Sequence, residues 1–245
     1  MGRAFEYRKA SKLKRWGAMS KIFPKLGKVI TMAAKAGSPD PDMNPRLRTA
    51  IINAKAQNMP KHNIEAAIAR ASGKDAADIK EIHYEAKGPY GTQFIIDCAT
   101  DNGTRTVANI KAALVRNKAE MLTSGSLNFM FTQKSVFTFD KKEGMDIEEL
   151  ELELIDFGLE EIEEDIEPQE NGEDKAIIRI YGAYTSFGAL GKALEEQGIE
   201  ITKAELQRIA NTPIDLTDEQ MEEVDILIEK LEDDEDVQAV YTNIN

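Results

Sequence analysis

Residues 44–71 read NPRLRTAIINAKAQNMPKHNIEAAIARA, and this stretch carries the clearest fold signals in the chain. Asn44 is a good N-cap, and the proline after it suits the first position of a helix. Apolar residues then recur at helical spacing from Leu47 onward. Pro60 interrupts the pattern, and a second apolar stripe follows until Gly73 ends it. The stretch therefore predicts a helical hairpin, and its arginines and lysines make that hairpin basic.

The residues before this stretch are also basic. Residues 20–36 predict a helix whose lysines fall within a narrow arc, opposite its apolar side chains. Residues 1–18 interleave basic and aromatic side chains, and we expect a helix or an arm that orders on binding. A lysine stripe is often only a soluble surface, but its continuation into residues 46–70 favours contact with nucleic-acid phosphates. The predicted contacts, with one from the start of a later helix, are Arg8, Lys9, Lys12, Lys14, Arg15, Lys21, Lys25, Lys28, Lys35, Arg46, Arg48, Lys55, Lys61 and Arg105.

The charge of the chain is strongly divided along its length. The net charge of the 245 residues is −13. Residues 1–74 hold 16 basic and 4 acidic residues, a net charge of +12, whereas residues 143–245 hold 6 basic and 32 acidic residues, a net charge of −26. Such a field attracts a polyanion to one end of the chain and repels it from the other. We therefore expect an oriented encounter with nucleic acid.

Length and composition exclude several classes of protein. No run of about 18 apolar residues could span a bilayer, and the N-terminus lacks the apolar core of a secretory signal, so we expect a cytoplasmic protein without a membrane partner. The one cysteine, Cys98, excludes an internal disulfide and a multi-cysteine metal site.

Beyond about residue 75 the pattern changes from helical to alternating. Strands are predicted at 79–87 and 93–99, joined by a tight turn at GPYG, residues 88–91. A helix follows to about Lys118, and residues 126–131 are predicted to form a third strand.

From Lys134 the order of elements is strand, helix, strand, a turn at Asn171-Gly172, strand, helix, strand, which is a ferredoxin-like βαββαβ unit. A capping box at Thr217 and Gln220 then begins a helix, and residues 237–241 form a last strand that returns to the second domain. The fold class is α+β, an N-terminal helical bundle followed by two small α/β sandwich domains. The predicted domains are a basic helical domain 1–75, an α/β domain 76–132 plus 209–245, and an acidic ferredoxin-like domain 133–208.

The stretch 143–174 has sixteen acidic residues and no basic one. We interpret most of them as solvated faces of a helix and an edge strand, where charge also discourages strand pairing. No loop has the ligand spacing of an EF-hand, so we expect no metal and no cofactor.

Catalysis is the remote alternative, because Cys98, His62 and His83 could meet as a nucleophile and a base. However, Cys98 follows apolar residues in a strand, which is typical of a small buried core residue. We therefore expect that the protein is not an enzyme.

Several blocks of this sequence together resemble the YebC/PmpR family, which includes the mitochondrial translational activator of cytochrome oxidase. The matching text is NPRLRTAIINAKAQNMPKHNIEAAI (44–68), YEAKGPYG (84–91), TDNGTRT (100–106), TSGSLNFMF (123–131) and LEDDEDVQAVYTN (231–243). The resemblance implies three domains, the second completed by the C-terminus. It also implies a gene-expression factor without established catalysis, described as a DNA-binding transcriptional regulator and, for some members, as a ribosome-associated translation factor that relieves stalling.

Two functional hypotheses follow. The first is a nucleic-acid-binding regulator whose basic domain contacts phosphates, while the acidic remainder faces water or protein. The second places the same basic helices on ribosomal RNA, with the acidic domain at the ribosome or at a basic protein. Phosphate contacts carry little sequence information, so the residues leave DNA and RNA both open.

Overall fold

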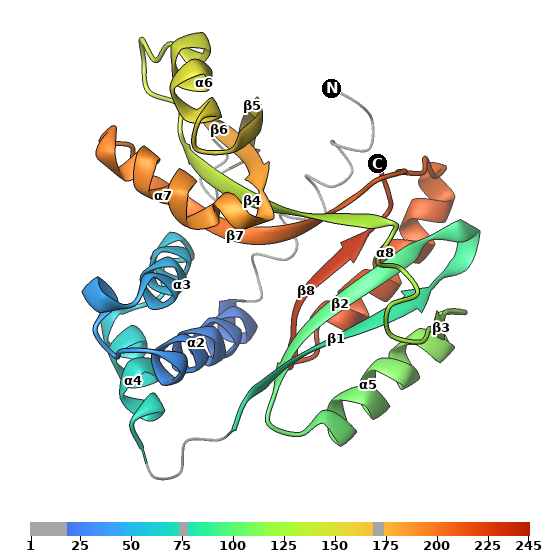
Figure 1. Cartoon of the computed structure of the whole chain (residues 1–245). Helices are drawn as coiled ribbons and strands as arrows, with labels where there is room; N and C mark the ends of the chain where they lie inside the picture. The colour runs from blue at the N-terminus through green and yellow to red at the C-terminus, as the bar shows by residue number, and fades with distance from the viewer. Residues whose placement is uncertain (1–18, 74–77, 169–173) are drawn as a thin grey trace. The chain divides into compact units, whose positions relative to one another are not determined.

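The computed structural model describes residues 19–73, 78–168 and 174–245. The N-terminal arm and the turn predicted at Asn171-Gly172 lie outside the described residues. The fold is α+β, as predicted, with helices in the N-terminal region and two four-stranded antiparallel sheets after them (Figure 1).

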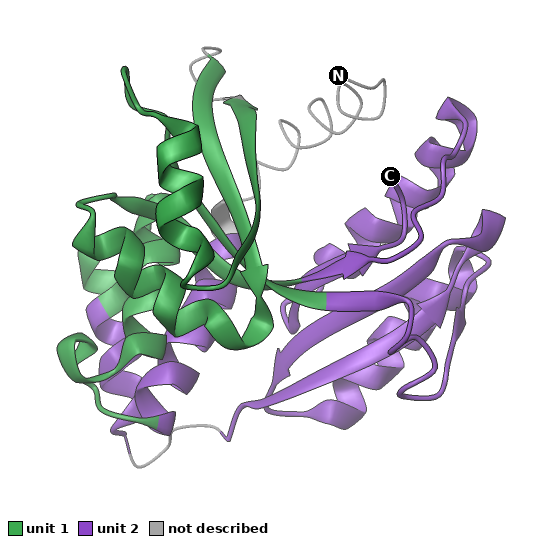
Figure 2. Ribbon diagram, turned by 45° about the horizontal axis from the view of Figure 1, so that its top comes forward, with its two compact units in different colours: residues 1–19, 37–64, 133–207 green, residues 20–36, 65–132, 208–245 purple. Residues whose placement is uncertain are grey.

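The described residues form two compact units, and each unit is described by itself (Figure 2). Unit 1 contains Gly37–Ile64 and Gln133–Gln207. Unit 2 contains Ser20–Ala36, Glu65–Thr132 and Arg208–Asn245. The limits predicted for three domains stay a proposal.

Unit 1 is built on the predicted ferredoxin-like sheet. Its strands lie in the order β5-β6-β4-β7, so that the first and third strands of the βαββαβ unit are neighbours in the centre (Figure 1). β4 and β6 pair antiparallel, as do β5 and β6. The elements of this unit are β4 (Phe131–Asp140), α6 (Ile147–Ile155), β5 (Leu159–Pro168), β6 (Asp174–Ala183), α7 (Phe187–Glu196) and β7 (Ile201–Ala210).

One face of this sheet and the inner sides of α6 and α7 form the core of unit 1. Phe139, Leu154 and Leu194 are fully buried in this cluster. The rings of Phe137 and Phe187 lie 4.9 Å apart in a tilted arrangement. Burial of such side chains contributes about 1.5–3 kcal/mol each, which makes this layer the main source of the unit's stability.

The helix α3 (Pro45–Ala56) also belongs to unit 1 and begins as predicted. The side chain of Asn44 accepts a hydrogen bond from the backbone N–H of Leu47, and Pro45 occupies the first turn. At the other end of the helix, the amide of Asn53 both donates to and accepts from the backbone of Ala204, at 2.8 and 2.9 Å. Since Ala204 lies on the edge strand β7, α3 covers part of an edge that would otherwise expose unpaired backbone groups.

Unit 2 contains the second sheet, with strands in the order β3-β1-β2-β8. The C-terminal strand pairs antiparallel with β2, and Val240 lies opposite Ile96. The capping box predicted at Thr217 and Gln220 is present and begins the last helix. Figure 1 shows α5 and α8 beside this sheet. The elements are α2 (Met19–Ala36), β1 (Lys80–Lys87), β2 (Gln93–Thr100), α5 (Gly103–Arg116), β3 (Glu120–Met121), α8 (Asp218–Glu232) and β8 (Val237–Thr242), and α4 (Lys61–Ala71) begins in unit 1 and ends in unit 2.

The strand predicted at residues 126–131 is wrong. This segment forms turns, and the strand β4 begins only at Phe131. The reason is the buried carboxylate of Glu85, which accepts hydrogen bonds from the backbone N–H groups of Gly125 and Leu127 at 2.6 and 2.7 Å. These donors are therefore not available to a β ladder, and Gly125 has a φ of +91° that a strand does not allow.

Candidate nucleic-acid interface

The predicted phosphate contacts fall into three groups. The first group is not placed: Arg8, Lys9, Lys12, Lys14 and Arg15 lie outside the described residues, as does the side chain of Lys21. The second group is bound to other residues of the unit to which each side chain belongs. The third group is exposed on helices of unit 1.

Lys25 and Lys28 of α2 belong to the second group. They meet the turn between α8 and β8, whose sequence is EDDED at residues 232–236. Lys25 Nζ donates to the carbonyl oxygen of Glu232 at 2.5 Å. Lys28 Nζ donates to the carbonyl oxygen of Glu235 at 2.9 Å and to Asp236 Oδ1 at 2.6 Å. Their ammonium groups are therefore already hydrogen-bonded to oxygens of the protein itself.

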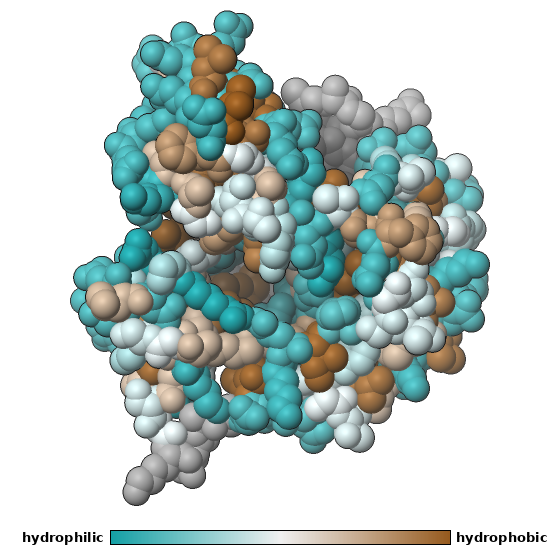
Figure 3. Space-filling view, in the orientation of Figure 1, coloured by the Kyte–Doolittle hydropathy of each residue, from teal (hydrophilic) through white to brown (hydrophobic). Residues whose placement is uncertain are grey.

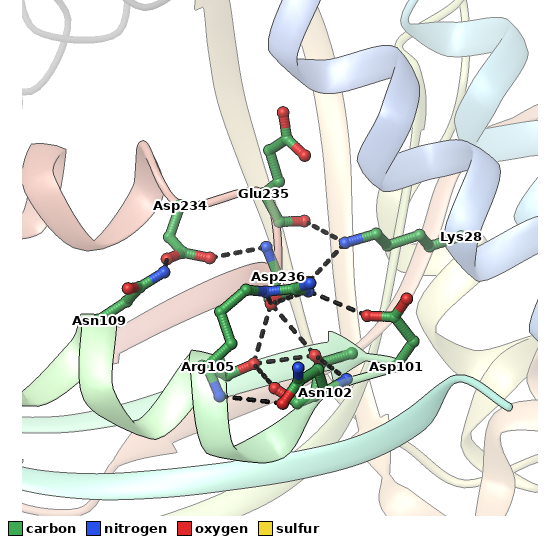
Figure 4. Close-up of polar contacts among 10 residues, drawn as sticks. Lys28, Asp101, Asn102, Arg105, Asn109, Asp234, Glu235 and Asp236 are labelled. Carbon is green, nitrogen blue, oxygen red and sulfur yellow. Dashed lines mark hydrogen bonds and ion pairs between the residues drawn. The ribbon is translucent and has the colours of Figure 1, made fainter. Parts of the chain in front are cut away.

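Asp236 is the centre of this contact, with only 2% of its side chain exposed. From α5, Arg105 Nη2 donates to Asp236 Oδ2 at 2.7 Å and to Oδ1 at 3.0 Å (Figure 4). The hydroxyls of Thr100 and Thr106 donate to Oδ2 at 3.1 and 2.9 Å. We call Lys28, Thr100, Arg105, Thr106 and Asp236 the Asp236 cluster.

Local structure places each member of this cluster. Asn102 caps α5 by accepting from the backbone N–H of Arg105, which sets the arginine in the first turn. The carboxylate of Asp234 accepts from the backbone N–H of Asp236 at 2.8 Å and from Asn109 at 2.9 Å (Figure 4). The turn is thus held at both ends, and the Asp236 carboxylate points at the two cations.

The electrostatics of the cluster are those of a buried, well-paired carboxylate. Burial alone would raise the pKa of Asp236, but hydrogen bonds from Lys28, Arg105 and Thr106 outweigh it and lower the pKa to about 2. Burial lowers the pKa of Lys25, and the neighbouring carboxylates of Glu232 and Asp234 oppose that effect. The carboxylate of Asp236 is therefore ionised at neutral pH.

Lys35 and Arg48 also have partners within their units. Lys35 Nζ lies 3.3 Å from Asp78 Oδ1 in an exposed ion pair. Arg48 Nε and Nη2 donate to the carbonyl oxygens of Pro41 and Asp42 at 3.3 and 3.1 Å, so this guanidinium is turned back on the segment before its own helix.

The third group is Arg46 and Lys55 on α3 and Lys61 at the start of α4. All three residues are exposed in unit 1. They stand on the helical hairpin of residues 44–71, where a polyanion can reach them from solvent.

The sequence pattern did not assign a role to Asp234 or Asp236. The available signal was the acidic turn EDDED beside a helix end, together with the lone arginine in TDNGTRT. Phe129 was also missed as a surface group: 75% of it is exposed, on the loop that Glu85 holds.

Cys98 does not form a nucleophile–base pair with His83. Cys98 lies opposite Ile82 in the β1–β2 pairing, and His83 lies opposite Asp97, so the two side chains project from opposite faces of the sheet. Cys98 is 3% exposed, and burial raises the pKa of its thiol to about 12. The thiol is therefore protonated and shielded at neutral pH.

The described residues hold neither a membrane span nor a metal-binding cluster. No helix among residues 19–73, 78–168 and 174–245 is both long and apolar enough to cross a bilayer. In the same residues, no three His, Cys, Asp or Glu side chains are grouped so that they could hold a metal ion.

Fold and site together define an α+β protein with a basic, helical N-terminal region, followed by two four-stranded sheets. Comparison with known families is consistent with this class: the TACO1/YebC N-terminal domain matches residues 3–74, and the TACO1/YebC second and third domain matches residues 79–244. The chain belongs to the TACO1/YebC family.

Relatives match over the whole length. A "Probable transcriptional regulatory protein" of Sulfurovum sp. (strain NBC37-1) is 73% identical over 245 residues, covering 100% of both chains. One from Sulfurimonas denitrificans, with the same name, is 64% identical over 244 residues, again covering 100% of both. The crystal structure of a conserved hypothetical protein from Aquifex aeolicus has a TM-score of 0.75 at 31% identity and covers 92% of this chain and 90% of that chain.

Replacing Asp236 by Asn tests the cluster. The substitution keeps the shape of the side chain but removes the charge that Lys28 and Arg105 share, so the free energy of unfolding should fall by about 3 kcal/mol in urea titrations. Asp78→Asn is the control, because its exposed ion pair with Lys35 should contribute less than about 1 kcal/mol. Equal losses for the two variants would contradict the role of Asp236.

The lowered pKa of Asp236 predicts that the stability difference between the unchanged protein and this variant depends on pH. The pKa of Asp236 in the folded protein is lowered from 3.8 to about 2, so its stabilisation is fully present above about pH 4 and is lost as the pH falls towards 2. The difference in unfolding free energy between the unchanged protein and Asp236→Asn should be constant near neutral pH and shrink below about pH 4. A difference that grows on acidification would contradict this assignment.

Cys98 should be inert in the native protein. Iodoacetamide is expected to leave the thiol unmodified at neutral pH and to alkylate it fully in denaturant, as measured by intact mass, because burial both shields the sulfur and raises its pKa. Rapid alkylation of the folded protein would show that the site opens.

Proposed function

We propose that the protein is a non-enzymatic, nucleic-acid-binding regulator of gene expression that contacts phosphates through its basic N-terminal residues 1–75. The observation that carries the proposal is the division of charge, with +12 on residues 1–74 against −26 on residues 143–245. The names of the relatives, probable transcriptional regulatory proteins, support the same function.

The hydrogen bonds within unit 2 support a smaller set of residues for these phosphate contacts. Lys25, Lys28 and Arg105 are hydrogen-bonded to oxygens of unit 2, and a phosphate would have to displace those partners. Such a displacement would strip a nearly buried Asp236 of its cations, which is costly. We therefore assign direct phosphate contacts first to Arg46, Lys55 and Lys61, with the basic residues before Lys25 as further candidates. The inner cations add long-range attraction and hold the fold.

The acidic remainder of the chain has a complementary part in this proposal. Its carboxylates repel a polyanion and so orient the basic end towards it. They also leave residues 143–245 available to a basic protein. The burial of Cys98 and the raised pKa of its thiol disfavour the cysteine-dependent alternative.

The binding experiment described below decides whether the nucleic acid is DNA or RNA. Phosphate contacts fix position and affinity without reading sequence, and both DNA and structured RNA present phosphates. A regulator that acts on transcription would prefer the DNA duplex, whereas a translation factor on ribosomal RNA would prefer the structured RNA.

Charge reversal of the exposed group tests the proposal. The triple variant Arg46→Glu, Lys55→Glu, Lys61→Glu should bind a DNA duplex and a structured RNA at least about tenfold more weakly in a filter-binding assay. On B-DNA, the slope of log affinity against log salt should fall by about 0.9 for each phosphate that the variant no longer neutralises.

The matched control is Lys142→Glu, Lys192→Glu, Lys203→Glu, which changes the net charge by the same amount at exposed lysines of unit 1. This control should retain nearly all of the affinity and the slope. If both triple variants lose affinity equally, only net charge matters and the assigned interface is wrong. If neither loses affinity, the proposed contacts are wrong.

A further inference from the structure

The helix α6 in unit 1 has apolar side chains on both of its faces. Leu150 and Leu154 are buried in the core of the sheet layer. Leu152 is 72% exposed and Ile155 is 51% exposed. At about 100° per residue, Leu152 and Ile155 lie about 60° apart on the side of the helix opposite the buried pair. Phe157, which follows the helix, is 41% exposed.

Leu152 and Ile155 are three residues apart on the helix, so they form a small apolar surface on the solvent-facing side of α6. Figure 3 shows hydrophobic atoms gathered at the top of the view, over α6. A single exposed leucine is ordinary, but a contiguous apolar patch rimmed by charge is typical of a surface that another molecule covers. We call Leu152 and Ile155 the α6 patch.

The exposed polar side chains that α6 and its C-cap place around the α6 patch are all acidic, and one of them, Glu153, accepts a hydrogen bond from Gln197 at 2.8 Å. The other exposed side chains of the helix and its C-cap are carboxylates: Glu148, Glu149, Glu151, Glu153 and Asp156. Glu149 and Glu153 are four residues apart and repel each other. The last turn has no basic residue, and Asp156 adds negative charge at the negative end of the helix dipole. These features destabilise the helix by itself and favour a cation on this surface.

Three of the six carboxylates of the neighbouring strand β5 differ in this respect. Glu160, Glu164 and Asp165 form ion pairs with Lys134, Lys141 and Arg179 from the same sheet. Across the part of the chain that the structure describes, no lysine or arginine forms an ion pair with the carboxylates of α6 and its C-cap. Among these described residues, the carboxylates of α6 therefore have no neutralising cation.

We infer that the α6 patch is a docking surface for a basic, amphipathic segment of a partner protein. Leu152 and Ile155 would receive apolar side chains, and the surrounding carboxylates would receive lysines or arginines at helical spacing. A nucleic acid is excluded by charge, because this helix lies in the part of the chain with net charge −26. This surface is independent of the proposed phosphate contacts on α3 and α4.

The test uses the full chain and a designed probe, an amphipathic helical peptide of leucines and lysines. A second peptide of equal charge, with serine in place of every leucine, measures attraction by charge alone. Fluorescence anisotropy should show that the leucine–lysine peptide binds at least about tenfold more tightly than the serine–lysine peptide. Leu152→Ser, Ile155→Ser should remove most of that difference.

Ile226→Ser on α8 is the matched control. Ile226 is also 51% exposed on an acidic helix, but Lys230 lies one turn away on that helix. This control should bind the leucine–lysine peptide as the unchanged protein does, and circular dichroism should show that all variants are folded.

Three outcomes would overturn the inference. Equal affinity for the two peptides would mean that only charge attracts them. Equal loss for the α6 and α8 variants would mean that the peptide has no defined site. Self-association in light scattering that Leu152→Ser, Ile155→Ser abolishes would make a second copy of this chain the occupant.

Discussion

Unit 2 depends on one buried interaction, the carboxylate of Asp236 held between Lys28 and Arg105. This carboxylate receives two cations and two threonine hydroxyls, so every favourable site on its oxygens is used. It joins α2, the end of β2, the start of α5 and the turn before β8, which come from distant parts of the sequence. A charge this deeply buried is tolerated only when its partners are all in place, so the cluster specifies the arrangement as well as stabilising it.

This constraint divides the basic side chains of the chain by role. The net charge of +12 on residues 1–74 suggests one continuous phosphate-binding surface. In the structure, however, Lys25 and Lys28 neutralise the acidic turn, and Arg48 is turned towards the carbonyls of Pro41 and Asp42. Arg46, Lys55 and Lys61 are exposed to solvent on α3 and at the start of α4. The net charge of the segment therefore indicates that the partner is negatively charged. The packing decides which basic residues can contact that partner.

Local signals made most of the fold predictable. The N-cap at Asn44, the capping box at Thr217 and the βαββαβ order all depend on residues close together in the sequence. The features that could not be predicted depend on contacts between residues that are far apart in the sequence. Residues 126–131 carry strand-like side chains, but the carboxylate of Glu85, 42 residues before Leu127, accepts a hydrogen bond from the backbone N–H of Leu127. Likewise, Asp236 lies 208 residues from Lys28, and no periodicity in the sequence shows that they meet. The exposure of Leu152 also depends on which face of α6 the sheet covers.

We propose that Lys25 and Lys28 hold the fold while Lys55 and Lys61 contact the nucleic acid. Lysine acylation followed by mass spectrometry, with and without a bound nucleic-acid duplex, tests it most directly. Lys55 and Lys61 should react readily in the isolated protein and become protected by the duplex, whereas Lys25 and Lys28 should react slowly in both conditions. Ready acylation of Lys25 and Lys28 in the isolated protein, followed by their protection when the duplex binds, would contradict the account.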